Sequence, residues 1–312
     1  SMADDISRAS NPSLSPYLVL PVGILAVSTA SLFIRFAQAE APSLVIAAGR
    51  MVVAALILAP VALTGHRAEL RSLTRRQGWL LVLGGIFLGA HFAAWITSLE
   101  YTSVASSVVL VTTAPLWVAL LAPLVLKERL TPNLWFGLAI ALAGSAVVTL
   151  SGNCTVAGGL HCSGFAQAFQ GRAAIGNGLA LLGAFLSAGY LLVGRAARGN
   201  MSLTAYTFVV YGVAALVLTL VVWLTGQRVT GFAPQTYLWL VALGVIPQLI
   251  GHSSFNWALK YLPATFVSIA LLGEPIGSVI LAYLFLAEAP AALEIIGGGM
   301  ILAGILFSSQ KR

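Results

Sequence analysis

Residues 101–144 read YTSVASSVVLVTTAPLWVALLAPLVLKERLTPNLWFGLAIALAG, and residues 261–304 read YLPATFVSIALLGEPIGSVILAYLFLAEAPAALEIIGGGMILAG. The positions of the first stretch that carry the same residue as the position 160 places later include Tyr101, Pro115, Leu121, Ala122, Glu128, Gly137, Ala143 and Gly144, which match Tyr261, Pro275, Leu281, Ala282, Glu288, Gly297, Ala303 and Gly304. Upstream, Leu63-Thr64-Gly65 matches Leu224-Thr225-Gly226 at an offset of 161. The chain therefore contains an internal repeat.

The composition predicts an all-α integral membrane protein. Of the 312 residues, 59% are hydrophobic and only 8% are charged, whereas a soluble domain carries about 25% charged residues. Apolar runs of 18 or more residues recur along the chain, and such a run crosses a hydrocarbon layer of roughly 30 Å as a helix. We expect ten transmembrane helices, at residues 17–35, 42–64, 78–99, 103–126, 133–151, 174–194, 202–225, 236–259, 263–286 and 290–308.

The repeat divides the expected helices into two sets of five. We expect Ser1-Met2 to be a cloning remnant without a structural role. The organisation that we predict is a flexible cytoplasmic tail at 1–16, a first five-helix repeat at 17–151, an outer loop at 152–173 and a second repeat at 174–309.

The net charge of +7 reflects membrane topology and is no indication of nucleic-acid binding. With the N-terminus inside, the inner segments hold twelve cations and the outer ones three. The inner cations are Arg8, Arg67, Arg71, Arg75, Arg76, Lys127, Arg129, Arg195, Arg198, Lys260, Lys311 and Arg312, and the outer ones are Arg35, Arg172 and Arg228. Both termini are therefore expected in the cytoplasm, in a multi-pass protein of a bacterial inner membrane.

Five is an odd number, so the second repeat must begin on the opposite side of the membrane from the first. The repeats are then inverted, related by a pseudo-two-fold axis in the membrane plane, as in many transporters. Such a pair has two arrangements of similar energy, one open to each side, which is the basis of alternating access. The alternative is a duplication that serves only the stability of the bundle.

The matched prolines Pro115 and Pro275 each fall in the middle of an expected span. Proline removes a backbone donor and clashes one turn back, so each helix should kink or break there. Carbonyl groups freed at that depth must face protein or a wet cavity. We expect the two prolines to act as hinges beside a transport site, the alternative being a kink that only shapes packing.

Polar side chains are costly inside a membrane, so each is expected to have a structural or functional role. In the eighth expected helix, Gln248, His252 and Asn256 follow one another at i, i+4 and i+8, which places them on one face. In the third, His91 and Trp95 share a face in the same way. These side chains are candidates for binding a small polar solute. The alternatives are helix–helix hydrogen bonds for the stripe on the eighth helix, a core histidine bonded to a carbonyl for His91, and plain packing for Trp95.

The fourth helix adds Thr112, Thr113 and Trp117 as candidate substrate-binding residues, because they flank Pro115. Threonines inside a helix also bond to their own backbone, so they are weak evidence alone. Trp117 could equally pack against lipid or protein.

Glu274 is the only acidic residue near the middle of an expected span, directly before Pro275. It could bind an ammonium group, carry a coupling proton or bond to the broken helix backbone, and the sequence leaves these three readings open. Arg50 is the only arginine well inside a span. It could cap carbonyls, pair with Glu40 or Glu274, or reach outward, and structural use is favoured.

Several classes of function are excluded or disfavoured. The only aspartates are Asp4 and Asp5, which removes a paired-aspartate intramembrane protease, and no phosphate-binding G-x-x-x-x-G-K-[ST] motif is present. No group of residues has metal-ligand spacing, so no metal is expected. Composition leaves Ser-His catalysis open, but the inverted repeat and the missing acid partner disfavour it, so no catalytic residue is expected. Cations are too few for phosphate-ester substrates. Cys154 and Cys162 lie in the expected outer loop, where a disulfide and two free thiols are both open.

The chain resembles the drug/metabolite transporter superfamily, specifically its ten-helix EamA-type exporters. In each half the resemblance includes, in order, a small-Leu-x-Tyr step, a mid-span proline, a helix-end glutamate and a glycine pair. These elements are Ser98-Leu99-Glu100-Tyr101, Pro115, Glu128 and Gly137-x6-Gly144, and then Ala258-Leu259-Lys260-Tyr261, Glu274-Pro275, Glu288 and Gly297-x6-Gly304. Arg50 also fits the pattern of the superfamily.

Within that superfamily the chain looks most similar to aromatic amino-acid exporters of the YddG type. The resemblance implies a central cavity lined by both repeats, no cofactor, and a small-molecule substrate bound without nucleic acid. His91, Trp95, Gln248, His252 and Asn256 would suit an amphipathic solute, since aromatic faces hold a ring while polar groups meet its amino and carboxyl ends.

We therefore predict that the protein is a carrier, not an enzyme, and that it exports amino acids, aromatic ones included, by alternating access. The alternative is a proton-coupled exporter of cationic lipophilic drugs or other small metabolites, with Glu274 as the acid. A sensor or scaffold without transport would need a soluble signalling domain or long tails, for which the sequence gives no sign. The bilayer is the expected environment, and the sequence is compatible with a monomer while leaving the oligomeric state open.

Overall fold

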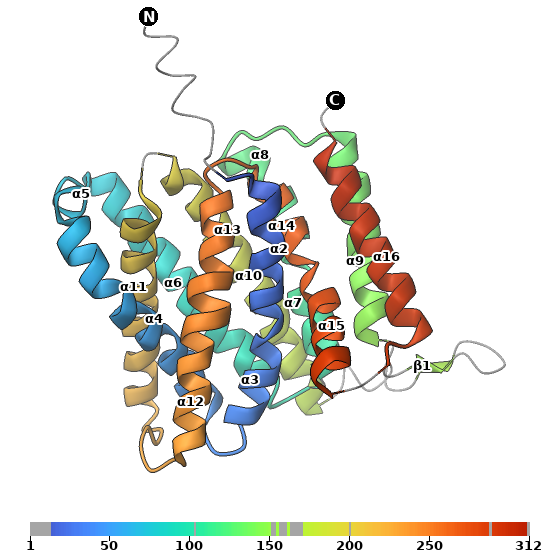
Figure 1. Cartoon of the computed structure of the whole chain (residues 1–312), viewed down its shortest axis with the longest axis horizontal. Coiled ribbons are helices and arrows are strands. Elements are labelled where there is room, and N and C mark those ends of the chain that lie inside the picture. The colour runs from blue at the N-terminus through green and yellow to red at the C-terminus, as the bar shows by residue number, and fades with distance from the viewer. Residues whose placement is uncertain are drawn as a thin grey trace, which may run out of the picture.

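A computed structural model of the chain describes residues 14–102, 104–150, 154–155, 161–162, 171–199, 201–286 and 289–310. These residues form a bundle of helices (Figure 1). The first half contains α2 (Pro16–Ser28), α3 (Ala30–Ala37), α4 (Ser43–Gly65), α5 (Arg67–Arg71), α6 (Arg75–Ser98), α7 (Val104–Val111), α8 (Ala114–Val125) and α9 (Pro132–Leu150). The second half contains α10 (Gly171–Arg198), α11 (Leu203–Leu224), α12 (Pro234–Leu243), the π-helix η3 (Gly244–His252), α13 (Ser253–Ala258), α14 (Ala264–Leu271), α15 (Glu274–Leu286) and α16 (Ala292–Ser309).

Among the described residues, eight helical segments are long and apolar enough to cross a membrane: Pro16–Ala37, Ser43–Gly65, Arg75–Ser98, Gly171–Arg198, Leu203–Leu224, Pro234–Ala258, Ala264–Leu281 and Ala292–Ser309. Two shorter apolar helices, Val109–Val125 and Pro132–Val148, lie in the expected fourth and fifth spans. The all-helical membrane architecture is confirmed. The count of ten crossings stays a prediction, because length and composition alone select eight.

The outer face of the bundle carries large apolar side chains. Leu124, Leu216 and Trp223 are each more than 70% exposed. Soluble proteins rarely leave such contiguous apolar surface in water, whereas lipid tails solvate it without cost. The exposed side chains therefore fit a protein whose surroundings are hydrocarbon.

In Figure 1, α2 begins and α16 ends at the same end of the bundle, which we call the termini end. The opposite end, where α3 ends and α12 begins, is called the far end. The main helix contacts join the two halves of the chain: α6 packs on α10, α4 on α11, α2 on η3, and α9 on α16. Neither half therefore buries its apolar faces alone.

Two helices break just before the matched prolines. The fourth span is interrupted at Thr112-Thr113 between α7 and α8, and the ninth at Leu272-Gly273 between α14 and α15. Pro115 stands in the first turn of α8, where its missing amide hydrogen costs nothing. The Thr113 hydroxyl donates to the carbonyl of Leu110 at 2.6 Å, and so satisfies an acceptor beside the break. The hinge role of Pro115 and Pro275 stays a prediction.

Two further irregularities were not expected from the sequence. The first span breaks at Thr29 between α2 and α3, and the eighth span is π-helical over Gly244–His252, with Pro247 inside the π segment. The two irregular segments belong to helices that pack on each other. A π segment changes the angular spacing of side chains, because its backbone bonds run from i to i+5.

The glycines shared by the two repeats allow α9 and α16 to touch through their backbones. A Cβ atom on Gly144 would lie 2.6 Å from the carbonyl oxygen of Gly297, and one on Gly304 would lie 2.5 Å from that of Gly137. Side chains never approach this closely, so only glycine fits. Small residues at such a seam let membrane helices associate through van der Waals contact. In Figure 1, α9 and α16 lie together at one side of the bundle.

Some expectations fall on residues that the structure does not describe. These are the tail up to residue 13, Glu288 and most of the loop at 152–173. Within that loop, β1 (Cys154–Thr155) and β2 (His161–Cys162) pair antiparallel, and the backbone of Cys154 is opposite that of Cys162. A disulfide between the two side chains stays a prediction.

We expect Gly304→Ala to lower the melting temperature of the purified protein, because the added methyl group must push α9 from α16. Overpacking of this kind costs about 1–3 kcal/mol. Gly299→Ala is the matched control on the same helix, since a Cβ atom there meets nothing within 4 Å. Equal melting temperatures for the two variants in detergent would show that the seam does not hold the bundle together.

Candidate transport site

A cavity lies between the two halves of the bundle. The space between its lining atoms is about 660 Å³, including the part open to solvent. The first half contributes Arg50, His91, Trp95 and Thr112, and the second half contributes His252 and Glu274, among others. The cavity is therefore lined by side chains of both halves of the chain.

Five of the nine predicted substrate-binding residues line the cavity: His91, Trp95, Thr112, His252 and Glu274. Pro115 also lines it. The breaks in the fourth and ninth spans therefore adjoin the cavity. Thr113, Trp117, Gln248 and Asn256 do not line it. Whether the lining residues bind a solute stays a prediction.

One wall of the cavity is aromatic. The rings of His91 and Trp95 are stacked 6.0 Å apart, and Phe92 meets the ring of His252 edge-on at 5.5 Å. His91 is held in place by its Nδ1 atom, which lies 2.8 Å from the carbonyl oxygen of Gly183. If Nδ1 carries the proton and donates it to this carbonyl, Nε2 is left as an acceptor. The indole nitrogen of Trp95 is buried and has no partner among the described residues.

Arg50 was expected to serve the structure, and its surroundings differ from each use foreseen. The side chain is only 1% exposed, and its Nε atom donates to Oε1 of Gln248 at 2.8 Å. The guanidinium group lies 4.2 Å from the centre of the Phe92 ring, a cation–π contact. In the part of the chain that the structure describes, both Nη atoms lack a hydrogen-bond partner. No ion pair within 4 Å joins Arg50 to Glu40 or Glu274 among these residues.

Glu274 begins α15 and is half-buried at the cavity wall. Its carbonyl oxygen accepts a bond from the Ser28 hydroxyl at 2.9 Å, which ties the break in the ninth span to α2. Its carboxylate makes no hydrogen bond or ion pair with the described residues, although Arg50 is close enough to attract it. Bonding of the Glu274 carboxylate to the broken helix backbone, one of the three open readings, is therefore not observed among the described residues.

The polar stripe on the eighth span is split. Gln248 and Asn256 are fully buried, while His252 reaches the cavity. The Asn256 amide donates to the hydroxyls of Tyr190 at 2.5 Å and Tyr211 at 3.2 Å. The π-helical turn between these positions removes the one-face spacing that i, i+4 implies in an α-helix. The two amides therefore make the helix–helix bonds that were the alternative reading.

Trp117 and Thr113 also serve packing. The Trp117 ring meets Phe185 edge-on at 5.6 Å, and the Thr113 hydroxyl is occupied by its own helix. Thr113 is part of the break in the fourth span, and Trp117 follows that break in α8. The side chains on the two sides of the break cannot then be assigned to one face from sequence spacing.

At the termini end, Glu128 and Arg195 connect three segments. Their side chains form an ion pair with Nε and Oε1 at 2.8 Å. Arg195 also donates to the carbonyl of Leu259 at 2.8 Å, and Glu128 accepts from the backbone of Ala264 at 3.2 Å. The loop after α8, the end of α10 and the turn between α13 and α14 are thereby joined.

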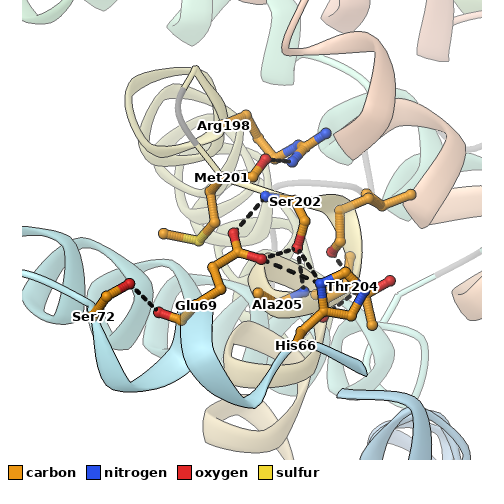
Figure 2. Close-up of polar contacts among 10 residues, drawn as sticks. His66, Glu69, Ser72, Arg198, Met201, Ser202, Thr204 and Ala205 are labelled. Carbon is orange, nitrogen blue, oxygen red and sulfur yellow. Dashed lines mark hydrogen bonds and ion pairs between the residues drawn. The ribbon is translucent and has the colours of Figure 1, made fainter. Parts of the chain in front are cut away.

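A second carboxylate at the same end caps a helix of the other half. Figure 2 shows Glu69 of α5 directed at Ser202, the N-cap residue of α11. Glu69 accepts from the Ser202 backbone at 2.7 Å and from its hydroxyl at 2.5 Å, and the Nδ1 atom of His66 lies 3.2 Å from both side chains. Partial burial raises the pKa of Glu69, but the bonds from Ser202 and His66 lower it more, so that its pKa is below the ordinary value.

The far end has a similar arrangement. Glu40, in the turn after α3, accepts from the backbone of Ala233 at 2.8 Å and from the Thr236 hydroxyl at 2.7 Å, just where α12 begins. These bonds lower the pKa of Glu40. Neither cap was predicted from the sequence, and Glu40 was named there only as a possible partner of Arg50. The available signal was the Ser202 N-cap and the proline at 234, which mark helix starts whose free amide groups need acceptors.

Comparison with known proteins places the chain in a family. The sequence profile described as the EamA-like transporter family matches residues 14–150 and again residues 174–310. The chain belongs to the EamA-like transporter family. The two matches follow the two halves of the repeat, and together with the helices they make the protein a multi-pass membrane transporter.

The relatives are mostly transporters without an assigned substrate. An uncharacterized transporter, YdfC, of Bacillus subtilis is 25% identical over 72% of this chain and 69% of its own. A similar protein of Archaeoglobus fulgidus is 25% identical over 78% and 81%. A probable terminal-alkyne amino-acid exporter of Streptantibioticus cattleyicolor is 25% identical over 65% and 63%. One crystal structure matches with a TM-score of 0.76 at 19% identity, over 94% of this chain and 96% of that one, which shows the fold.

We expect Glu69→Gln to lower the melting temperature near neutral pH, because the neutral amide accepts more weakly than the charged carboxylate. A carboxylate with a lowered folded pKa stabilises above its unfolded pKa of about 4.3, and this contribution is lost as the pH falls through the folded value. The difference in melting temperature between the variant and the wild type should therefore become smaller at acid pH.

The control for this prediction is Glu100→Gln, because Glu100 is exposed after α6 and its carboxylate has no described partner. A melting difference for Glu69→Gln that stays constant from neutral to strongly acid pH would contradict the proposed role of the charge.

Proposed function

We propose that this transporter exports amino acids, aromatic ones included, from the bacterial cytoplasm by alternating access through the central cavity. The observation that carries the proposal is the lining of that cavity, which combines an aromatic wall with one acidic and one basic side chain drawn from both halves. An aromatic amino acid has the matching groups, namely a ring, an ammonium and a carboxylate.

The chemistry of the lining favours such a solute over a wholly apolar or a polyanionic one. The rings of Trp95, His91 and Phe92 offer apolar faces to a side chain. The carboxylate of Glu274 is half-buried at the wall and without a partner among the described residues, as a group that receives an ammonium should be. The name of the Streptantibioticus relative, a probable amino-acid exporter, supports the same substrate class.

The mechanism that we propose uses two inverted five-helix repeats. In its support, the family profile matches twice, and the two helix breaks are 160 residues apart. The packing of α6 on α10 also has its counterpart, at the repeat offset, in the packing of η3 on α2. Exchange between two such arrangements would require the bonds at one end to open while those at the other close.

The orientation that we propose has both termini in the cytoplasm of a bacterial inner membrane. The distribution of lysine and arginine supports it, because the termini end carries most of them. The ion pair of Glu128 with Arg195 would then act at the cytoplasmic side. We propose export as the direction because the amino-acid relative is named an exporter. In a passive carrier, the gradient of the solute decides the direction of net transport.

The first test is uptake of labelled phenylalanine into proteoliposomes that contain the purified protein, without an ion gradient. We expect uptake above that of empty liposomes and competition by other unlabelled amino acids. Uptake that begins only when a proton gradient is imposed would favour the proton-coupled alternative. No uptake under either condition would overturn the amino-acid proposal.

The second test separates a zwitterionic substrate from a cationic drug. We expect Glu274→Gln to weaken phenylalanine transport by about tenfold, as for loss of one charge-assisted contact. Transport of a permanent lipophilic cation, if the wild type supports any, should be abolished by the same change. The control is Glu100→Gln, outside the cavity. Complete and equal loss of both transport activities would speak against substrate binding by Glu274 and for proton coupling.

A further inference from the structure

The cavity contains a buried cation whose hydrogen-bonding capacity is only partly used. A guanidinium group has five N–H donors in a fixed plane. In Arg50 the Nε donor is taken by Gln248, and the four donors on the two Nη atoms have no acceptor among the described residues. The side chain is 99% buried, so bulk water does not replace the missing acceptors.

An unpaired charge in this position is costly, and ordinary structural arginines do not show it. Arg198 is the matched example in this chain, since it is also only 2% exposed. Its Nε atom donates to the carbonyl of Asn256 at 2.9 Å, and its Nη1 atom donates to that of Met201. Arg198 thus uses its donors to hold α10 to α13, whereas the Nη donors of Arg50 have no acceptor among the described residues.

The contacts of Arg50 fix the direction of its free edge. Gln248 holds the Nε side, and Phe92 covers one face of the guanidinium plane at 4.2 Å. The remaining edge carries the two Nη atoms, which are the pair that binds a carboxylate through two parallel bonds. Lysine has no such edge, which explains the use of arginine here.

We infer that Arg50 binds the carboxylate of the transported solute and that this contact selects carboxylate-bearing substrates over the corresponding amines. The inference rests on the proposed function and deepens it. Glu274, on the other half of the chain, receives the ammonium group, and the rings of Trp95 and His91 hold the side chain. A bound zwitterion then bridges the two halves through opposite charges. Because both Nη atoms are covered in the arrangement described, a movement of the lining side chains accompanies binding.

The test compares three ligands that share a phenyl ring: phenylalanine, 3-phenylpropionate, which lacks the amine, and phenethylamine, which lacks the carboxylate. Their affinities are measured by calorimetry on the full-length protein in detergent. For the wild type we expect phenylalanine and 3-phenylpropionate to bind at least tenfold more tightly than phenethylamine. Phenethylamine binding as tightly as phenylalanine would overturn the inference, and this comparison needs no variant.

Arg50→Lys keeps the positive charge and loses the paired donors. We expect it to lower the affinity for phenylalanine and 3-phenylpropionate by about tenfold or more, as for loss of a bidentate contact, and to leave the affinity for phenethylamine unchanged. Glu274→Gln should give the opposite pattern, with phenethylamine weakened and 3-phenylpropionate unchanged. Arg198→Lys is the control for a buried arginine outside the cavity, and should change none of the three ratios.

Two outcomes separate this inference from the proposed function. If 3-phenylpropionate binds in an Arg50-dependent manner while phenylalanine does not, the carboxylate contact stands and the amino-acid proposal fails. If Arg50→Lys leaves phenylalanine binding unchanged, or weakens all three ligands equally, Arg50 is a structural residue, whereas amino-acid export survives. Absence of binding for all three ligands would overturn both.

Discussion

Every feature of this transporter depends on the absence of water in the hydrocarbon layer. A backbone N–H or C=O group without a partner costs several kcal/mol there, so a chain can leave the regular helix only where protein or a cavity receives the freed groups. The breaks before Pro115 and Glu274, and the irregular turns at Thr29 and Gly244–His252, all occur where helices of the two halves meet. The cavity is therefore where the helices are irregular.

The same constraint explains how the two halves are held together. Outside the cavity, the halves touch through apolar packing and through glycines that bring α9 and α16 into backbone contact. At the two ends of the bundle, where water is present, carboxylates make the contacts between the halves. Glu69 and Glu128 at the termini end, and Glu40 at the far end, accept bonds from amide groups at helix starts of the second half. In the mechanism that we propose, these bonds open at one end while the apolar seam persists.

The cavity lining includes one basic and one acidic charged side chain, Arg50 and Glu274. Arg50 and Glu274 come from different halves and attract each other without forming an ion pair. An ion pair would have satisfied both groups and left little reason for a solute to bind. Their separation keeps two opposite charges available beside an aromatic wall. In the function that we propose, a change in the relative position of the halves would alter this spacing and so link the binding of a charged solute to the transport movement.

The sequence by itself determined the membrane class, the repeat and the breaks near the matched prolines. The class and the breaks follow from local chemistry, namely apolar length and proline geometry. Polar or amphipathic side chains at membrane depth are costly, so the sequence could single out five residues of the cavity: His91, Trp95, Thr112, His252 and Glu274. Only the tertiary structure separated His252 from Gln248 and Asn256, because a π-helical turn changes which side chains share a face. It alone also revealed the free edge of Arg50, since whether a buried donor has an acceptor depends on side chains nearly 200 positions away along the chain.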